Sequence, residues 1–200
     1  MKLICWWLGT DALTLRVNPP SSSRLWYLKL FLYRIKWKLI HRFFEHWSVH
    51  KNLVKFLNGF GIKDVKINID PPKYITRDQI PHDTFNVLYY RPNPVNLGGQ
   101  DYIDWYYGYE IFKQVKKNLP FINFIEVDGT QDLKDIYPYI DCYIRPNYFD
   151  GMPRMVLEAE LLNIPYIWIS ETDNNGILKP SVEKTIKFIE DEYHAWVLQH

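Results

Sequence analysis

The sequence predicts an α/β protein in two halves, in which short β-strands alternate with helices. The first observation is that apolar runs of strand length alternate along the chain with longer amphipathic segments. The second is a polar run from Asp70 to Asp83, which begins Asp-Pro-Pro and separates the two sets of elements. The third is that 47% of the 200 residues are hydrophobic, which is enough for a packed core.

The first half, residues 1–75, is expected to begin with a buried strand over Leu3–Leu8 that ends at Gly9. Thr10 or Asp11 is suited to cap a helix after this turn, and a simple capping role is one interpretation of both residues. Two further elements are expected in this half, a helix over 52–60 and an alternating strand over 65–69.

Residues 24–46 are both aromatic and basic, with six Lys or Arg side chains before the first acidic residue, Glu45. Four of the polar side chains share one stripe at helical spacing, namely Arg34, Lys38, His41 and Arg42. One interpretation is a core helix with a solvated basic face. The other is a surface that touches anionic lipid, as a basic helix rich in Trp and Phe does. The sequence leaves both open.

The second half follows a linker over 76–85 and comprises residues 86–180, with a final amphipathic helix in 181–200 that is expected to pack back on the first half. Strands are expected over 86–90, 122–127, 139–144 and 166–169, and helices over 107–118, 133–139 and 153–162. Strand, helix and strand therefore follow one another repeatedly, as in parallel α/β folds.

Composition excludes several classes of function. The net charge of +1 gives no case for nucleic-acid binding by the whole molecule. The two cysteines, Cys5 and Cys142, fall in expected strands of different halves and are typical of small buried hydrophobes in a reducing compartment. No stretch is long and apolar enough to span a bilayer, and the start lacks a signal-peptide layout, so a cytoplasmic location is expected.

The histidines and serines exclude two common hydrolase classes. No His-x-x-x-His pair with a nearby acid suits zinc, and no serine lies in a Gly-x-Ser-x-Gly elbow. We therefore expect neither a metalloprotease nor a serine hydrolase, and we expect no bound metal and no cofactor.

The stretch most suggestive of chemistry is Asp150-Gly151-Met152-Pro153-Arg154, which continues into an apolar helix bearing Glu158. Glycine and proline mark a turn between a strand and this helix, and the first-turn amides would face the mouth of the sheet, where a diphosphate can dock. A carboxylate in an apolar helix is costly without a partner. A purely structural alternative is that Asp150 caps the helix and Glu158 pairs with Arg154.

This stretch, followed by a helix and Ile-Pro-Tyr-Ile-Trp, resembles the Glu-x7-Glu signature of the retaining GT-B glycosyltransferases of family 4. The resemblance implies two Rossmann-like domains facing a cleft, the first of them reduced here. It also implies that Asp150 lies by the donor sugar and that Glu158 holds the ribose of the nucleotide. The Tyr107–Glu110 segment is similar to a Tyr-Gly-x-Glu segment of archaeal members, and the scarcity of alanine fits an archaeal or viral source.

Two other segments carry the resemblance. Trp-Leu-Gly-Thr-Asp, ending at Asp11, is similar to a turn on the acceptor side of these enzymes, which implies that Asp11 faces the active site. Arg91 follows the 86–90 strand, where the family holds the donor diphosphate, although no lysine follows it in the usual place. The resemblance thus implies two catalytic residues, Asp150 and Asp11, and six donor-binding residues, Glu158, Arg91, Gly151, Met152, Pro153 and Arg154.

The function implied is metal-independent, retaining transfer of a sugar from a UDP- or GDP-sugar to an unknown glycan, lipid or protein acceptor. The alternative is a nucleotide-sugar-binding module or inactive relative without turnover. Peripheral membrane contact through residues 24–46 is a further expectation that the sequence leaves open.

Overall fold

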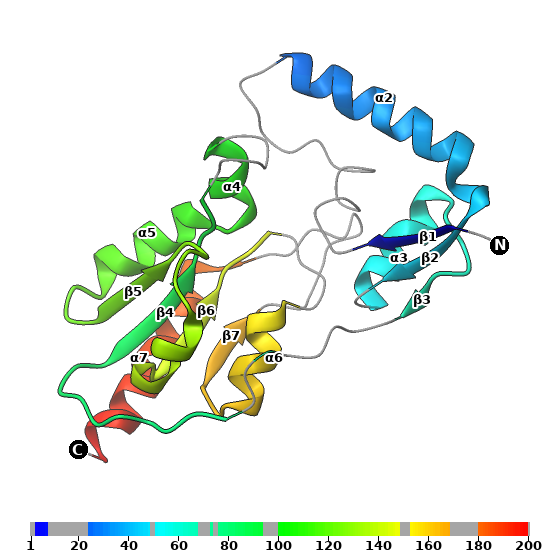
Figure 1. The fold of residues 1–200 in the computed structure, drawn as a ribbon. Helices are drawn as coiled ribbons and strands as arrows, with labels where there is room; N and C mark the ends of the chain where they lie inside the picture. The colour runs from blue at the N-terminus through cyan, green and yellow to red at the C-terminus, as the bar shows by residue number, and fades with distance from the viewer. Residues whose placement is uncertain are drawn as a thin grey trace.

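The structure is a computed structural model that describes residues 3–7, 24–48, 51–67, 73, 76–93, 100–148, 153–168 and 180–199. It contains two β-sheets, and every strand pair in them is parallel. A three-stranded sheet has the order β1-β2-β3 and a four-stranded sheet has the order β5-β4-β6-β7 (Figure 1). The chain is therefore a mixed α/β protein, as the alternation of strands and helices predicts.

The four-stranded sheet is built around β4, Asn86–Tyr90, which lies between β5, Asn123–Val127, and β6, Cys142–Arg145. The last strand, β7, Tyr166–Trp168, pairs with β6. Four of the five β4 residues and all four β6 residues are buried. A central strand of a parallel sheet is covered on both faces, which explains why these strands are continuous apolar runs in the sequence.

Helices cover both faces of this sheet, since parallel strands need crossover connections. The elements between and after the strands are α4, Gln100–Tyr106; α5, Tyr109–Asn118; two 3-10 turns, η3, Leu133–Asp135, and η4, Tyr137–Tyr139; α6, Arg154–Leu161; and α7, Val182–Val197. The single short helix expected over 133–139 is thus two 3-10 turns. Within the described part of the chain, α7 packs mainly against α5 and β6.

Side chains alternate between the two faces of the sheet. Val87 and Tyr89 of β4 pack in one cluster with α5 and with Ile189 of α7, whereas Leu88 packs in another with Val156 and other residues of α6. Val87 and Leu88 are fully buried. Burial of such a side chain contributes roughly 1.5–3 kcal/mol, so the two clusters fix the helices on the sheet.

The three-stranded sheet contains β1, Leu3–Trp7; β2, Phe44–Ser48; and β3, Lys66–Ile67. Its helices are α2, Arg24–Ile40, followed by the turn η1, His41–Phe43, and α3, Lys51–Phe60. The expectation of one helical segment over 24–46 is wrong at its end, because residues 44–48 form the middle strand. Long-range pairing, such as Leu3 with Phe44, overrides the helical spacing of the local sequence.

The segment expected to be a polar linker, 76–85, is attached to the second half. Arg77 donates hydrogen bonds to the carbonyl oxygens of Tyr137 (3.0 Å), Ile140 (2.6 Å) and Leu162 (3.0 Å). The Ile80 amide donates to Pro138 O at 2.9 Å. Burial lowers the pKa of Arg77, which the nearby Asp141 carboxylate opposes.

Among the described helices, none is both long and apolar enough to cross a membrane. Within the same part of the chain, no three His, Cys, Asp or Glu side chains are grouped so as to hold a metal ion. Cys142 is a buried free thiol in β6, and burial raises its pKa well above the usual range, as expected for an inert core residue.

Candidate functional site

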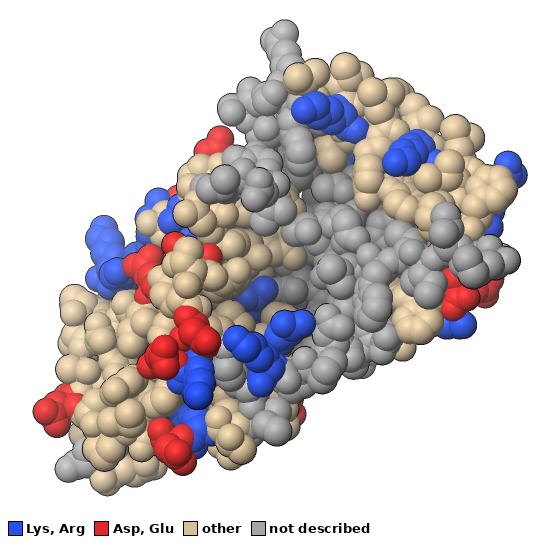
Figure 2. Space-filling view, viewed as in Figure 1, with Lys and Arg blue, Asp and Glu red and all other residues tan. Residues whose placement is uncertain are grey.

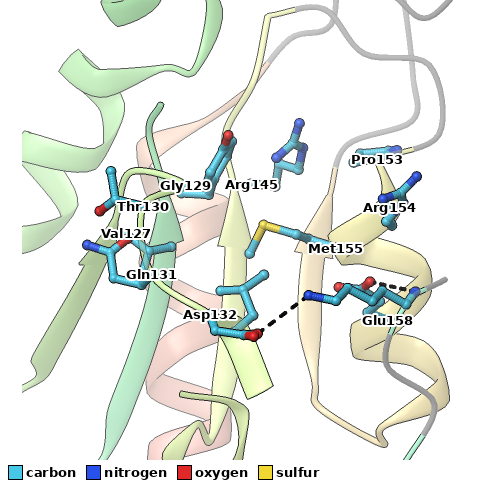
Figure 3. A pocket seen from close by; sticks show the side chains of 13 residues that line it. Val127, Gly129, Thr130, Gln131, Asp132, Arg145, Pro153, Arg154, Met155 and Glu158 are labelled. Carbon is cyan, nitrogen blue, oxygen red and sulfur yellow. Dashed lines mark hydrogen bonds and ion pairs between the residues drawn. The ribbon is translucent and has the colours of Figure 1, made fainter. Parts of the chain in front are cut away.

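A cavity of about 500 Å³ lies at the carboxyl ends of β4, β5 and β6, beside the start of α6 (Figure 3). In parallel α/β sheets this edge is where ligands bind, because loops diverge there and helix N-termini point toward it. The lining residues are Lys73, Tyr90, Val127, Gly129, Thr130, Gln131, Asp132, Leu133, Arg145, Pro153, Arg154, Met155 and Glu158. Three of the sequence-predicted site residues are in this set: Pro153, Arg154 and Glu158.

Glu158 is a buried carboxylate in the cavity wall, only 1% exposed. Its Oε2 accepts a hydrogen bond from the Tyr137 hydroxyl at 2.7 Å, and its Oε1 accepts one from the Lys73 amide at 3.0 Å. Burying a carboxylate is costly unless hydrogen bonds satisfy it, and these two donors do so. The carboxylate is thus fixed in position. Its described partners are Tyr137 and Lys73, and they do not include Arg154, with which the structural alternative paired it.

The helix that carries Glu158 begins at the cavity. Pro153 is its N-cap, with ψ of 130°, and the Val156 amide donates to the Pro153 carbonyl at 3.0 Å. The structural alternative, in which Asp150 is the N-cap residue of this helix, is therefore wrong. The positive end of the helix dipole faces the cavity, where it favours an anion.

Basic side chains reinforce this positive end. Arg154 occupies the first turn of α6, and no acidic residue lies in that turn. A cation at a helix N-terminus is unfavourable by about 0.3–1 kcal/mol on its own, because it repels the dipole. A bound anion would offset that repulsion, because both the arginine and the positive end of the helix attract it. Lys73 is also in the lining, and its ammonium lies 3.7 Å from the Asp132 carboxylate.

Arg145 is the cationic residue that the sequence analysis missed. It ends the buried strand β6, is 8% exposed, and lies between Gly129 and the start of α6 (Figure 3). Its guanidinium donates to the Tyr143 hydroxyl at 3.0 Å and lies 5.5 Å from the centre of the Tyr107 ring. These contacts hold a guanidinium at the edge of a cavity, where it can bind phosphate oxygens. The one feature of the sequence that could have pointed to Arg145 is its position directly after three apolar strand residues, Cys142–Ile144.

Tyr90, at the end of β4, borders Arg145 in the cavity. Its ring centre is 6.0 Å from the Arg145 guanidinium. Burial raises the pKa of the Tyr90 hydroxyl, and the positive charge of Arg145 opposes the rise. The hydroxyl therefore stays protonated at neutral pH and is available as a hydrogen-bond donor.

Arg91, the sequence-predicted diphosphate residue, follows β4 but is not in the cavity lining. Its Nε and Nη2 atoms contact Asp104 Oδ1 at 2.8 Å and 2.6 Å, and its guanidinium stacks 3.9 Å from the centre of the Tyr109 ring. These contacts tie the end of β4 to α4 and α5. The geometry thus brings Arg145, rather than Arg91, to the cavity.

The loop that leads from β6 toward the cavity is fixed by the corner between α4 and α5. Gly108 has a φ of 65°, and a Cβ atom there would lie 1.9 Å from Pro146 O. The Tyr148 amide donates to Tyr106 O at 3.2 Å, and the Tyr148 ring stacks on Trp105 at 5.8 Å. Only glycine allows this close approach of the two backbones. The Tyr-Gly-x-Glu segment therefore has a structural role in placing the loop.

The remaining sequence-predicted residues lie outside the described part of the chain: Asp11, Asp150, Gly151 and Met152. Their roles stay predictions. The described residues supply a fixed carboxylate, a buried guanidinium, a second arginine and a helix N-terminus around one cavity. This combination suits a ligand with an anionic group and a hydroxyl-bearing group, since the carboxylate accepts hydrogen bonds and the cations donate them.

Comparisons with known proteins show the fold. No protein-family model matches the chain, and no curated protein sequence matches it. A crystal structure of a mutant of S. aureus TarM, in complex with fondaparinux, alpha-GlcNAc-glycerol and UDP, is 11% identical with a TM-score of 0.54. The match covers 94% of this chain and 44% of the TarM chain, so this chain spans less than half of that protein's length. At this level of identity the likeness shows a shared α/β fold.

Proposed function

We propose that the protein is a glycosyltransferase that takes a sugar from a nucleotide-sugar donor bound in the cavity. The observation that carries the proposal is the fixed, buried Glu158 in the same cavity as Arg145 and the N-terminus of α6. A ribose offers two vicinal hydroxyls to a carboxylate, and a diphosphate offers anionic oxygens to the arginines and helix amides. The UDP in the TarM complex supports a nucleotide diphosphate as the ligand class.

In the proposed arrangement, two Rossmann-like domains face a cleft, with a reduced acceptor-side domain at residues 1–75 and a donor domain at 86–180. Glu158 accepts hydrogen bonds from the ribose, and Arg145, Arg154 and the α6 amides bind the diphosphate. Charge accumulates on the departing diphosphate as its bond to the sugar breaks, so these groups bind the transition state more tightly than the ground state.

The proposed reaction is retaining and needs no metal. The bond between the sugar C1 and the diphosphate oxygen breaks while the acceptor oxygen bonds to C1 from the same face, and the acceptor proton passes to the leaving diphosphate. Asp150 and Asp11 are proposed to orient the donor sugar and the acceptor. The donor is a UDP- or GDP-sugar, and the acceptor is a glycan, lipid or protein.

Calorimetric titration of UDP, GDP and their sugars into the full chain tests the site. We expect Glu158→Gln to weaken binding about tenfold or more, because it removes a charged acceptor. Glu160→Gln is the matched control, since Glu160 lies on the exposed side of the same helix. Equal affinity of Glu158→Gln and the unchanged protein for every nucleotide would refute the assignment.

A second pair of variants tests the diphosphate site. Arg145→Gln should weaken binding of the nucleoside diphosphate about tenfold or more while leaving binding of the parent nucleoside nearly unchanged. Arg91→Gln is the comparison, because Arg91 is bound to Asp104 outside the cavity lining. Release of free UDP or GDP from the sugar donors then separates a transferase from a binding module, which would bind the donor without any release.

A further inference from the structure

The helix α2 presents an apolar face to solvent. Six of its side chains are between 41% and 63% exposed: Leu25, Leu28, Phe31, Leu32, Ile35 and Leu39. Phe43 in the following turn is 59% exposed. Large contiguous apolar patches are rare on the surface of a monomer and mark sites of contact with another surface. This set of seven residues is called the outer face of α2 below.

The six helical residues of the outer face form one continuous stripe. With 3.6 residues per turn, they fall within an arc of about 120°. The opposite side of the helix is the one that packs inward, where Leu30 is 4% exposed and Trp37 contacts Phe44 and His46 of β2 at 5.5 and 6.3 Å between ring centres. The helix is therefore apolar on two sides, and only one of them is covered.

Lysines border the outer face on both sides. At helical spacing Lys29 and Lys36 lie along one edge of the stripe and Lys38 along the other, and all three are exposed. Figure 2 shows basic side chains set in the otherwise uncharged surface over this helix. Arg34, by contrast, is half-buried, and burial lowers its pKa. The basic stripe expected from the sequence is therefore only partly solvated: Lys38 and Arg42 are exposed, whereas Arg34 and His41 are half-buried.

Charge is distributed unevenly along the chain. Between Arg24 and Lys66 there are ten Lys or Arg residues and two acidic ones, although the whole chain has 24 basic and 23 acidic residues. No acidic residue lies between Arg24 and Phe44. A second copy of this basic surface would repel the first, whereas an anionic surface would attract it.

We propose that the outer face of α2 docks on an anionic lipid bilayer, with the helix lying in the plane of the interface. An apolar stripe bordered by lysines is the arrangement that buries Leu and Phe among acyl chains while ammonium groups remain at the phosphates. A 17-residue helix is about 25 Å long, which suits a surface position. This docking is independent of whether the cavity binds a nucleotide sugar.

Vesicle flotation with the full chain tests the proposal. The vesicles are phosphatidylcholine alone or phosphatidylcholine with about a third phosphatidylglycerol. We expect binding to the anionic vesicles that decreases as salt is added, because lysine attraction to lipid phosphates is screened. Two variants separate the electrostatic contribution to binding from the apolar one. The first removes charge by combining Lys29→Gln, Lys36→Gln and Lys38→Gln. The second removes apolar surface by combining Leu28→Ser and Leu32→Ser.

Each variant has a matched control on other elements. The charge control is Lys113→Gln, Lys117→Gln and Lys187→Gln, which are exposed lysines of α5 and α7, and the apolar control is Leu161→Ser with Leu198→Ser. The α2 lysine variant should lose roughly a hundredfold in partition coefficient, at about fivefold for each lysine. The apolar variant should lose at least tenfold, and the controls should bind as the unchanged protein does. Circular dichroism and thermal melts verify that each variant is folded.

Three results would overturn the proposal. One is the absence of binding to anionic vesicles at low salt. Another is a loss in the control variants equal to that in the α2 variants. The third is a dimer in analytical ultracentrifugation that Leu28→Ser with Leu32→Ser converts to a monomer, because the outer face would then be covered by a second copy of the chain.

Discussion

The Tyr137 hydroxyl donates a 2.7 Å hydrogen bond to Glu158 Oε2, and both side chains are at most 2% exposed. The two residues come from different elements, the 3-10 turn η4 before β6 and the helix α6 after it. A hydrogen bond to a buried carboxylate is among the stronger ones in proteins, and here it fixes the direction in which the carboxylate points. Tyr137 therefore positions Glu158 for the ligand proposed above.

Tyr137→Phe should lower the free energy of unfolding by about 1.5–3 kcal/mol, because the buried carboxylate loses a donor. Nucleotide affinity should decrease by less than in Glu158→Gln, since the carboxylate itself remains. Chemical denaturation and calorimetric titration measure the two effects. In a Glu158→Gln background the same tyrosine change should cost less, and additive costs in the double-mutant cycle would show that the two residues are not coupled.

Gly108→Ala should destabilise the protein by more than about 2 kcal/mol and weaken nucleotide binding. The new Cβ would lie 1.9 Å from Pro146 O, and φ of 65° is unfavourable for alanine. Gly61→Ala is the matched control, because Gly61 has φ of 104° and nothing lies within 4 Å of its built Cβ. Denaturant unfolding compares the two. Equal costs would mean that the close approach to Pro146 contributes nothing beyond backbone conformation.

The sequence predicted those elements whose pattern lies within their own residues, and it missed those that are defined by pairing with distant residues. The strand β4 was predicted with its observed bounds, Asn86–Tyr90, because a strand buried on both faces is a continuous apolar run. The strand β2 was missed, because Phe44–Ser48 is defined by pairing with β1 some forty residues away and its own spacing also fits a helix. The sequence left the outward side of α2 open for a related reason, since both sides of the helix are apolar.

The candidate site shows the same division. Glu158 was found from the sequence, because a carboxylate in an apolar helix beside a glycine-proline turn is conspicuous. Arg145 was not found, because only the assembled sheet places the end of β6 beside the start of α6. The preference for Arg91 came from its position after β4. The structure shows that Asp104 and Tyr109, which are remote in sequence from that strand, engage its guanidinium.

Arg77→Gln should lower the free energy of unfolding by about 3 kcal/mol. The guanidinium donates to three carbonyl oxygens, and glutamine cannot reach all three, so part of the buried backbone loses its partners. Asp78→Asn is the matched control, because its side chain is exposed next to Arg77. Urea denaturation followed by circular dichroism measures both. A cost for Arg77→Gln no larger than that for the control would show that the 76–85 segment contributes little to the stability of the second half.

Glu192→Gln should stabilise the protein at neutral pH and not in acid. Burial, and then the charge of Asp191, raise the pKa of Glu192 in the folded protein. The folded state therefore holds this proton more tightly than the unfolded state, whose glutamate has a pKa of about 4.3. Protonation of Glu192 therefore adds to the free energy of unfolding. This contribution is fully present below the pKa of the unfolded state and is lost as the pH rises through the pKa of the folded state.

Glutamine mimics the protonated form at every pH, so the melting temperature of Glu192→Gln should exceed that of the unchanged protein by about 1–2 °C at pH 7. The two proteins should melt together at about pH 3, where the glutamate is protonated in both states. Glu190→Gln is the control, because Glu190 is exposed on the same helix. An equal gain at both pH values would show that the effect comes from packing around Trp196 and Asp141 in the cavity that Glu192 lines, rather than from its ionisation.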